Sequence, residues 1–301
     1  MEKKLRVAII QSTLDNMAAW QVMDQNFPNI NKWESMRIWE ESVNALRSLA
    51  TMPESQRPHV IVLPEFGVDK NHEYDLKSFA HLTGSIIIGG VGFKNEGGAI
   101  YNKAIVTIPY GWPFGNGDSD YHSFYLGKKH PARVEDSFIK KVARLTGQKC
   151  YFEHSKEIYI LSLPNFGNIG LAICADFYDI ERYMVYQGRI QHLLLLAYNQ
   201  DTESFNHLAE SAARLIFCNV VICNTGYHGG SMAFSPRKKS YERVLYSHYG
   251  SKLCTVQTVE LPVSDLIEAQ KTESGHPDFK TMPPGYKFYD PGLCSDDWST
   301  K

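Results

Sequence analysis

Two residues that could do chemistry, a glutamate and a cysteine, stand directly after apolar runs. Glu65 follows VIVLP at residues 60–64, and Cys174 follows GLAI at residues 170–173. Functional groups of α/β folds gather at the carboxyl ends of strands, so both side chains are expected at the mouth of a sheet. Residues 125–131, YLGKKHP, add a predicted loop with two lysines and a histidine. A thiolate is a nucleophile, and a neighbouring carboxylate can take the thiol proton.

Each of these residues also has an ordinary explanation. A glutamate after a strand is usually solvated, a lysine pair usually lies on the surface, and most free cysteines are small core residues. The six cysteines lack the CxxC spacing of zinc sites, and a chain of 301 residues does not need a disulfide framework. We therefore expect a reducing, cytoplasmic setting. No metal and no cofactor are implied, because no His, Cys and Asp cluster has ligand spacing.

Composition excludes some classes of partner. The net charge of −2 indicates neither nucleic acid nor an acidic membrane surface as a main partner. No stretch approaches the roughly 20 apolar residues of a membrane span. The start of the chain, MEKKLRVAIIQS, superficially resembles a signal peptide. Its apolar run is too short and has no small-residue cleavage site, so we interpret it as a first strand.

Apolar runs alternate with helical patterns along the chain. Apolar positions at spacings of three and four predict a helix near residues 36–50, and others are expected near 138–145 and 202–217. The runs predict strands at residues 5–10, 59–63, 85–93, 99–109, 158–163, 167–174, 189–197 and 219–224, with at least one more in 246–260. Turns at 94–98 and 164–165 indicate hairpins. The pattern favours a layered α/β domain with mixed sheets.

Three segments resemble the signature blocks of the carbon–nitrogen hydrolase, or nitrilase-like, superfamily, in that family's order. They are HVIVLPEF at residues 59–66, KKH at 128–130 and GLAICAD at 170–176, the last with Glu181 seven residues after the cysteine. The segment YNKA at residues 101–104 is similar to the family's Tyr-Asn-x-Ala strand. The resemblance covers roughly residues 5 to 267.

The resemblance implies a fold and an assembly. The fold would be a four-layer α-β-β-α sandwich of two mixed sheets, formed by a domain of residues 1–269. Protomers of the family pair, so a homodimer or larger homo-oligomer is expected. Residues 270–301, rich in Pro, Gly and charge, would form a tail that is either mobile or docked through Tyr286, Phe288 and Trp298.

The resemblance also assigns roles. Cys174 would attack the substrate as a thiolate, and Glu65 would serve first as general base and then as general acid. Lys128 and the backbone N–H of Ala175 would stabilise the oxyanion. Glu135 would orient Lys128 or the substrate amide.

The lysine assignment has a rival, because Lys129 is adjacent and a shift of one loop residue would exchange the two. We expect His130 to be structural.

The implied function is hydrolysis of a small linear amide or ureido compound through a thioester, releasing ammonia or an amine. A nitrile would use the same residues. The alternative is an inactive or partner-gated module that senses or binds within a larger assembly. Ala175 stands where the family commonly has an aromatic residue, Asp179-Ile180 replaces a Phe-Pro pair, and residues 17–33 resemble an insertion. These departures leave the substrate unnamed.

Overall fold

The chain folds around two β-sheets packed face to face. The computed structural model describes residues 3–20, 29–115 and 120–289. Trp298, and part of the expected insertion at residues 17–33, lie outside the described residues. Within them, none of the helices is both long enough and apolar enough to cross a membrane.

The first sheet has a parallel centre and antiparallel edges. Its strand order is β13-β1-β2-β3-β4-β5, with the short β6 paired to β4. Strands β1, β2 and β3 run parallel, whereas β13, β4 and β5 pair antiparallel to their neighbours. The bounds are β1 Lys4–Gln11, β2 Val60–Val62, β3 Ile86–Glu96, β4 Ala99–Pro109, β5 Tyr121–Gly127, β6 Tyr151–Phe152 and β13 Thr255–Pro262.

The second sheet is also mixed. Its order is β12-β11-β10-β9-β8-β7, in which β8, β9 and β10 are parallel. The bounds are β7 Ile160–Leu163, β8 Gly167–Ile173, β9 His192–Ala197, β10 Asn219–Asn224, β11 Met232–Phe234 and β12 Val244–Ser247. The hairpins expected at residues 94–98 and 164–165 are present as β3–β4 and β7–β8.

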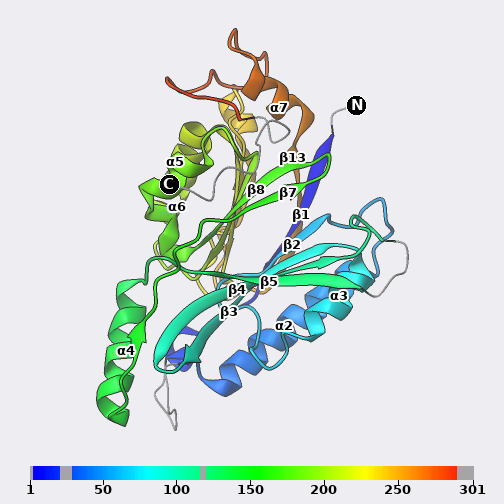
Figure 1. Ribbon diagram of the computed structural model, residues 1–301. Helices are drawn as coiled ribbons and strands as arrows, with labels where there is room; N and C mark the ends of the chain where they lie inside the picture. Colours follow the sequence, from blue (N-terminus) through cyan, green and yellow to red (C-terminus); the bar gives the residue numbers. More distant parts are fainter. Residues whose placement is uncertain (1–2, 21–28, 116–119, 290–301) are drawn as a thin grey trace.

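Helices cover the outer face of each sheet, as Figure 1 shows. Helices α2 (Lys32–Ala50) and α3 (Asp75–Thr83) pack on the first sheet. Helices α5 (Ile180–Tyr186) and α6 (Thr202–Ala212) pack on the second, and α6 continues into a π-helix at Ala213–Phe217. The four-layer α-β-β-α sandwich predicted from the sequence is confirmed.

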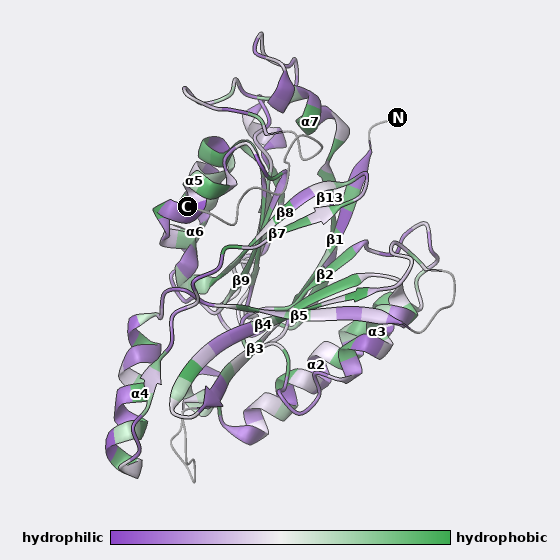
Figure 2. Ribbon diagram, viewed as in Figure 1, coloured by the Kyte–Doolittle hydropathy of each residue, from purple (hydrophilic) through white to green (hydrophobic). Residues whose placement is uncertain are grey.

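This layering explains the continuous apolar runs. In β2, Val60 and Val62 belong to the core between the sheets, whereas Ile61 packs with the helices on the outer face. Successive strand residues point to opposite faces, so a sheet covered on both sides needs apolar residues at every position. Figure 2 shows the resulting concentration of hydrophobic residues in the strands.

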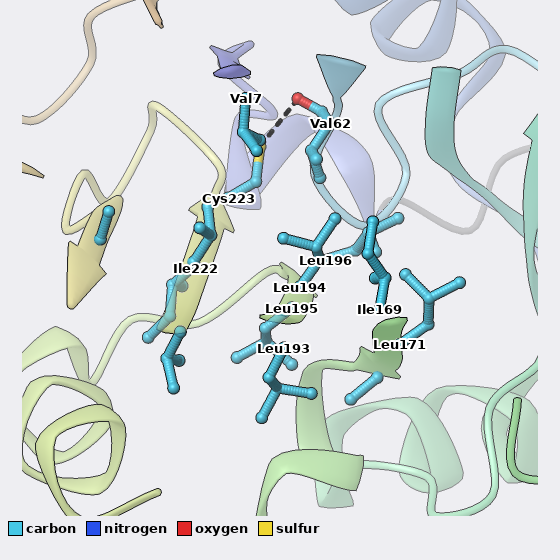
Figure 3. Packing of buried hydrophobic residues seen from close by; sticks show 14 of the residues in the cluster. Val7, Val62, Ile169, Leu171, Leu193, Leu194, Leu195, Leu196, Ile222 and Cys223 are labelled. Atoms are coloured by element: carbon cyan, nitrogen blue, oxygen red, sulfur yellow. Dashed lines mark hydrogen bonds between the residues drawn. The ribbon is translucent and has the colours of Figure 1, made fainter. Parts of the chain in front are cut away.

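The core between the sheets is almost entirely aliphatic (Figure 3). Leu193, Leu194, Leu195 and Leu196 of β9 are fully buried. The Cys223 thiol of β10 points across to the other sheet, where its Sγ lies 3.3 Å from the carbonyl oxygens of both Ile10 and Val62 and its single hydrogen can be donated to either. Cys223 therefore behaves as the small core residue that sequence statistics favour for a cysteine.

Some elements differ from the expectation. Residues 125–127 end strand β5 instead of forming a loop, which corrects the interpretation of residues 125–131 as a loop. This edge strand is mostly exposed, so it lacks the apolar run by which the other strands were found. Helices α1 (Asn16–Ala19), α3 and α7 (Ser264–Lys271) were not predicted; α1 and α7 are too short to show a clear helical period.

The segment from residue 270 to 289 packs on the second sheet's side of the molecule. Phe279 is 1% exposed, and the Tyr286 ring lies 5.8 Å from that of Phe217, centroid to centroid. The buried Gln270 amide, in α7, donates to the carbonyl oxygens of Ile190 and Phe217. Docking of the tail and the domain boundary at residue 270 remain predictions.

His192 is a buried, neutral imidazole whose hydrogen bonds leave no room for a second proton. Its Nε2 donates to the Phe166 carbonyl oxygen at 2.9 Å, and its Nδ1 accepts from the Asn219 amide at 3.1 Å. A proton on Nδ1 would face the Asn219 amide, which is itself a donor. Burial lowers the pKa of His192 from 6.5 to about 4.

We expect this histidine to weaken the fold in acid. The unfolded chain binds its proton below pH 6.5 and the folded protein only near pH 4, so the free energy of unfolding falls as pH decreases between these values. The loss from His192 should reach about 3 kcal/mol. Urea unfolding at several pH values, compared with His192→Gln, measures it. Equal pH slopes in both proteins would contradict the prediction.

The outer face of the second sheet's helices carries exposed apolar side chains. Ile180 and Met184 of α5 are 75% and 74% exposed, and Leu215 of the π-helix that follows α6 is 52% exposed. Such a cluster is typical of a protein–protein interface.

We expect a homodimer by light scattering at micromolar concentration and a monomer for Met184→Lys. Leu82→Lys, on α3 at the opposite face, is the control that should stay dimeric; a monomeric wild type would contradict the prediction.

Candidate active site

Glu65 is buried where the chain leaves the first sheet. Strand β2 ends at Val62, and the Pro64 carbonyl oxygen accepts from Gly90 N on neighbouring β3. Phe66, directly after Glu65, has a left-handed backbone with φ of 64°. Its ring is 1% exposed, so the turn is fixed by the burial of Phe66 as well as by the proline. Glu65 itself is 2% exposed.

Lys128 enters the same buried space from the end of β5. Its backbone N donates to the Asn102 carbonyl oxygen on β4, which fixes where the side chain starts. Its Nζ donates to Glu65 Oε1 at 2.8 Å and to Glu135 Oε2 at 2.5 Å. The side chain is 1% exposed. Of the two adjacent lysines, Lys128 is therefore the one that contacts Glu65.

Lys129 and His130 face away from this cluster. The Lys129 ammonium pairs with Asp179 at 3.3 Å and with Glu181. The backbone N–H groups of both residues donate to the buried Asp176 carboxylate, at 3.0 Å and 2.8 Å to its Oδ1. The lysine loop is thus bonded to the segment that follows Cys174.

Glu135 lies in the first turn of helix α4 (Arg133–Thr146). Its Oε2 accepts from the Ala132 backbone N at 2.6 Å and from Lys128, and its Oε1 accepts from the Asn102 amide at 2.6 Å. The positive end of the helix macrodipole also favours a carboxylate here. Both oxygens of Glu135 are occupied by protein donors.

Cys174 is the first residue after β8 and begins a 3-10 helix at Cys174–Tyr178. Its backbone is left-handed, with φ of 45°, which is uncommon and strained for a residue with a Cβ. The thiol is buried and donates to the Tyr198 carbonyl oxygen at 3.6 Å, and the Glu65 carboxylate lies close enough to act on its pKa. The N–H of Ala175 is in the first turn, where a helix supplies no internal acceptor.

The charges of this cluster are strongly coupled. Burial raises the pKa of Glu65 from 4.5 to about 7, a rise that Lys128 limits. Burial, reinforced by the Glu65 carboxylate, raises the pKa of the Cys174 thiol well above its usual range. Burial alone would lower the pKa of Lys128, but the Glu135 and Glu65 carboxylates outweigh it and raise that pKa. The thiol is therefore neutral at neutral pH, and Glu65 becomes fully ionised only above about pH 7.

Asp176 connects the cysteine turn to helix α5. Its carboxylate is 1% exposed and pairs with Arg182 at 3.2 Å. Arg182 in turn donates to the Leu171 carbonyl oxygen of β8 at 2.7 Å. Together with the bonds from the lysine loop, these contacts hold Cys174 and Lys128 at a fixed separation.

Asn102 is a member of the cluster whose role the sequence did not show. It lies on β4, is 1% exposed, and donates to both Glu65 and Glu135. The Tyr-Asn-x-Ala resemblance at residues 101–104 was the signal that could have found it. Within the described residues, no group of three or more His, Cys, Asp or Glu side chains is arranged to hold a metal ion.

The fold is shared with solved structures of the carbon–nitrogen hydrolase class. A CN-hydrolase superfamily protein from Xanthomonas campestris, with an arsenic adduct in its active site, is 15% identical with a TM-score of 0.57, over 89% of this chain and 94% of that one. An amidase from Nesterenkonia sp. AN1, as a double mutant with acrylamide, is 12% identical with a TM-score of 0.59, over 88% and 93%.

Another structure of the Nesterenkonia amidase carries the acetamide moiety of fluoroacetamide added covalently at its active-site cysteine. It is 13% identical, with a TM-score of 0.59, over 88% of this chain and 92% of that one. No family model and no curated protein sequence matches the chain. At these identities the likeness establishes the fold, which is the sandwich that the three sequence blocks predicted.

Proposed function

We propose that this protein hydrolyses the C–N bond of a small linear amide or ureido compound through a thioester on Cys174. The observation that carries the proposal is the buried contact of Lys128 with Glu65, beside the buried thiol of Cys174, whose pKa both charges affect. Perturbed ionisable groups gathered in a buried site are typical of catalysis. The amide ligands of the Nesterenkonia amidase support this substrate class.

Glu65 acts as general base because the thiol is neutral at rest. As the sulfur attacks the carbonyl carbon, the S–H proton passes to the Glu65 carboxylate, so the net charge of the buried cluster does not change. The protonated Glu65 then gives its proton to the departing nitrogen, which leaves as ammonia or an amine. Water, deprotonated by Glu65, then attacks the thioester carbon. The C–S bond breaks, the acid is released, and Glu65 returns the proton to the Cys174 sulfur.

Lys128 stabilises the oxyanion of the tetrahedral intermediate. An ammonium has three hydrogens, and two are directed at Glu65 and Glu135. The third is available to the former carbonyl oxygen, together with the N–H of Ala175. Glu135 holds Lys128 in this position. Cys174, Glu65 and Lys128 would attack a nitrile in the same way.

Ammonia release from a panel of short aliphatic amides, N-carbamoyl compounds, ureas and nitriles tests the proposal. We expect turnover of at least one amide or ureido compound by the wild-type protein and none by Cys174→Ala. A thioester intermediate should appear in intact-protein mass spectra as an acyl adduct that maps to Cys174. Turnover that survives Cys174→Ala would exclude this mechanism.

Thiol labelling separates an enzyme from an inactive module of the same fold. Cys174 is 6% exposed, whereas Cys254 is on the surface but has a pKa raised by burial of its thiol to about 11. If Glu65 activates Cys174, iodoacetamide should modify Cys174 faster than Cys254 despite the difference in access. Slower labelling of Cys174, with no turnover in the panel, would favour the partner-gated or inactive module.

The free thiols of the described cysteines agree with a reducing, cytoplasmic setting.

The pH dependence of turnover should report Glu65. The base must be ionised, and its pKa is about 7, so kcat/KM is expected to rise through pH 7 and then level off. Initial rates of ammonia release between pH 5 and 9 measure this. A rise centred near 4.5, the usual value for a glutamate, would show that burial does not control the base.

A further inference from the structure

Asn102 joins the two carboxylates of the site through a single amide group. Its Nδ2 donates to Glu65 Oε1 at 2.7 Å and to Glu135 Oε1 at 2.6 Å. The amide nitrogen has two hydrogens, so each carboxylate receives one. The side-chain oxygen of Asn102 has no hydrogen-bond partner in the described part of the chain, so every side-chain bond found for Asn102 is donated to a carboxylate.

The sheet places Asn102 beside Lys128. Strands β4 and β5 are antiparallel with Lys103 opposite Gly127, so the next pair along is Asn102 and Lys128, joined by the bond from Lys128 N to the Asn102 carbonyl oxygen. Residues directly opposite each other in neighbouring strands project to the same face. The amide and the ammonium therefore approach Glu65 and Glu135 from adjacent positions on one surface.

The four oxygens of Glu65 and Glu135 do not all accept from these donors. Glu65 Oε1 accepts from both Lys128 and Asn102. Glu135 has both oxygens occupied, Oε1 by Asn102 and Oε2 by Lys128 and the Ala132 backbone. Only Glu65 Oε2 accepts from none of these groups, and it is therefore the oxygen that can receive a proton without losing a donor.

We propose that Asn102 is a positioning residue, which fixes Glu65 Oε1 so that Oε2 is the atom that takes the proton of Cys174. The inference rests on the proposed function and names the atom and the residue that control its first step. In that step the S–H bond breaks and an O–H bond forms on Oε2. The sulfur electron pair forms the S–C bond, and the C=O π electrons move to the carbonyl oxygen.

The amide should also adjust the strength of the base. A hydrogen bond donated to an ionised carboxylate favours the ionised form. Removing the Asn102 donor leaves Glu65 more easily protonated, so the acid limb of any process that needs its ionised form should move to higher pH. Because a hydrogen bond to a charged group contributes roughly 1.5–3 kcal/mol, the expected shift is about one to two pH units.

The test compares Asn102→Leu and Asn102→Asp with the wild-type protein. Leucine has a similar size and no donor. Aspartate keeps the shape but offers one hydrogen when protonated and none when ionised. Asn168→Leu is the matched control, because Asn168 is also buried and donates its amide to the Arg189 carbonyl oxygen, outside the cluster. The readout is the rate of Cys174 alkylation by iodoacetamide against pH, measured by peptide mass spectrometry, with kcat/KM for any substrate found.

We expect the alkylation midpoint near pH 7 in the wild type and in Asn168→Leu, and a midpoint at least one unit higher in both Asn102 variants. Lower activity with an unchanged midpoint would mean a purely structural role and would overturn the inference. If Asn102→Leu does not fold, Asn102→Asp decides.

Alkylation does not require turnover, so the two hypotheses fail separately. A wild-type protein that hydrolyses nothing but still shows the shift would refute the proposed function and leave the role of Asn102 intact.

Discussion

Cys174→Ser should fold normally and lose nearly all turnover, with kcat lower by roughly three orders of magnitude or more. The hydroxyl is a far poorer nucleophile than a thiol at neutral pH, and Glu65, with a pKa of about 7, is too weak a base to deprotonate an alcohol to a useful extent. The buried position accepts an oxygen in place of sulfur, because the Tyr198 carbonyl remains an acceptor. Ammonia release gives kcat, and thermal unfolding checks the fold.

Cys254→Ser is the matched control for this substitution. The residue is exposed and lies directly before β13, where the charged groups that act on its thiol are Glu41 and Arg37. We expect its turnover and unfolding temperature to equal those of the wild type. Comparable activity in Cys174→Ser and Cys254→Ser would remove Cys174 from the mechanism.

Lys128→Met should damage both stability and catalysis. The change leaves Glu65 and Glu135 buried with Asn102 as their shared donor, and removal of one partner of a buried ion pair typically costs about 3–5 kcal/mol. It also removes a donor to the oxyanion, which should lower kcat by about 10²–10³ with a smaller effect on KM. Urea unfolding and steady-state kinetics measure the two effects.

The free energy of unfolding of Lys128→Met should depend on pH in a direction that the charges determine. Without the ammonium, the folded variant holds a carboxylate proton to higher pH than the unfolded chain, in which a glutamate has a pKa of 4.5. The folded state then binds more protons, so the free energy of unfolding should fall as pH rises above 4.5.

Lys129→Met is the control for Lys128→Met. Lys129 pairs with Asp179 and with the exposed Glu181, and partly exposed pairs contribute about 1 kcal/mol or less. We expect its kcat to be unchanged. If Lys129→Met were instead the variant with the larger loss of kcat, the assignment of the catalytic lysine would be wrong by one residue.

The central strands could be predicted because burial on both faces leaves a continuous apolar run. Val60–Val62 and Asn219–Asn224 are such runs, and both were found within a few residues. Strand β5 was missed because an edge strand with one solvated face needs few apolar residues, and Tyr121–Gly127 is half polar. The two longest helices with an apolar stripe, α2 and α4, were found, whereas the eight-residue α7 was not.

Most residues of the candidate site were predicted from the sequence, and one was missed. Glu65 and Cys174 were predicted because they follow apolar runs in segments that resemble family blocks, and Lys128 and Glu135 because the family uses a lysine block and a glutamate after it. The role of Asn102 was missed. The resemblance of residues 101–104 to a family strand marks the position, but a single asparagine within a strand carries no local sign that it bridges two distant carboxylates. Contacts between residues 37 and 33 positions apart depend on the sheet register, which a single sequence does not specify.

The candidate site lies between the two sheets, so the packing of the core sets the distances between its residues. Glu65 and Lys128 leave the first sheet at the ends of β2 and β5, whereas Cys174 leaves the second at the end of β8. In the proposed mechanism, the distance between Glu65 and Cys174 is therefore set by the thickness of the aliphatic layer between the sheets. Substitutions such as Val62→Ala or Leu196→Ala, which lie in the core between the sheets, would alter that thickness, and misplacement by about 1 Å can cost roughly 10²-fold in rate. Packing of the core therefore affects the distances between the candidate site residues as well as the stability of the fold.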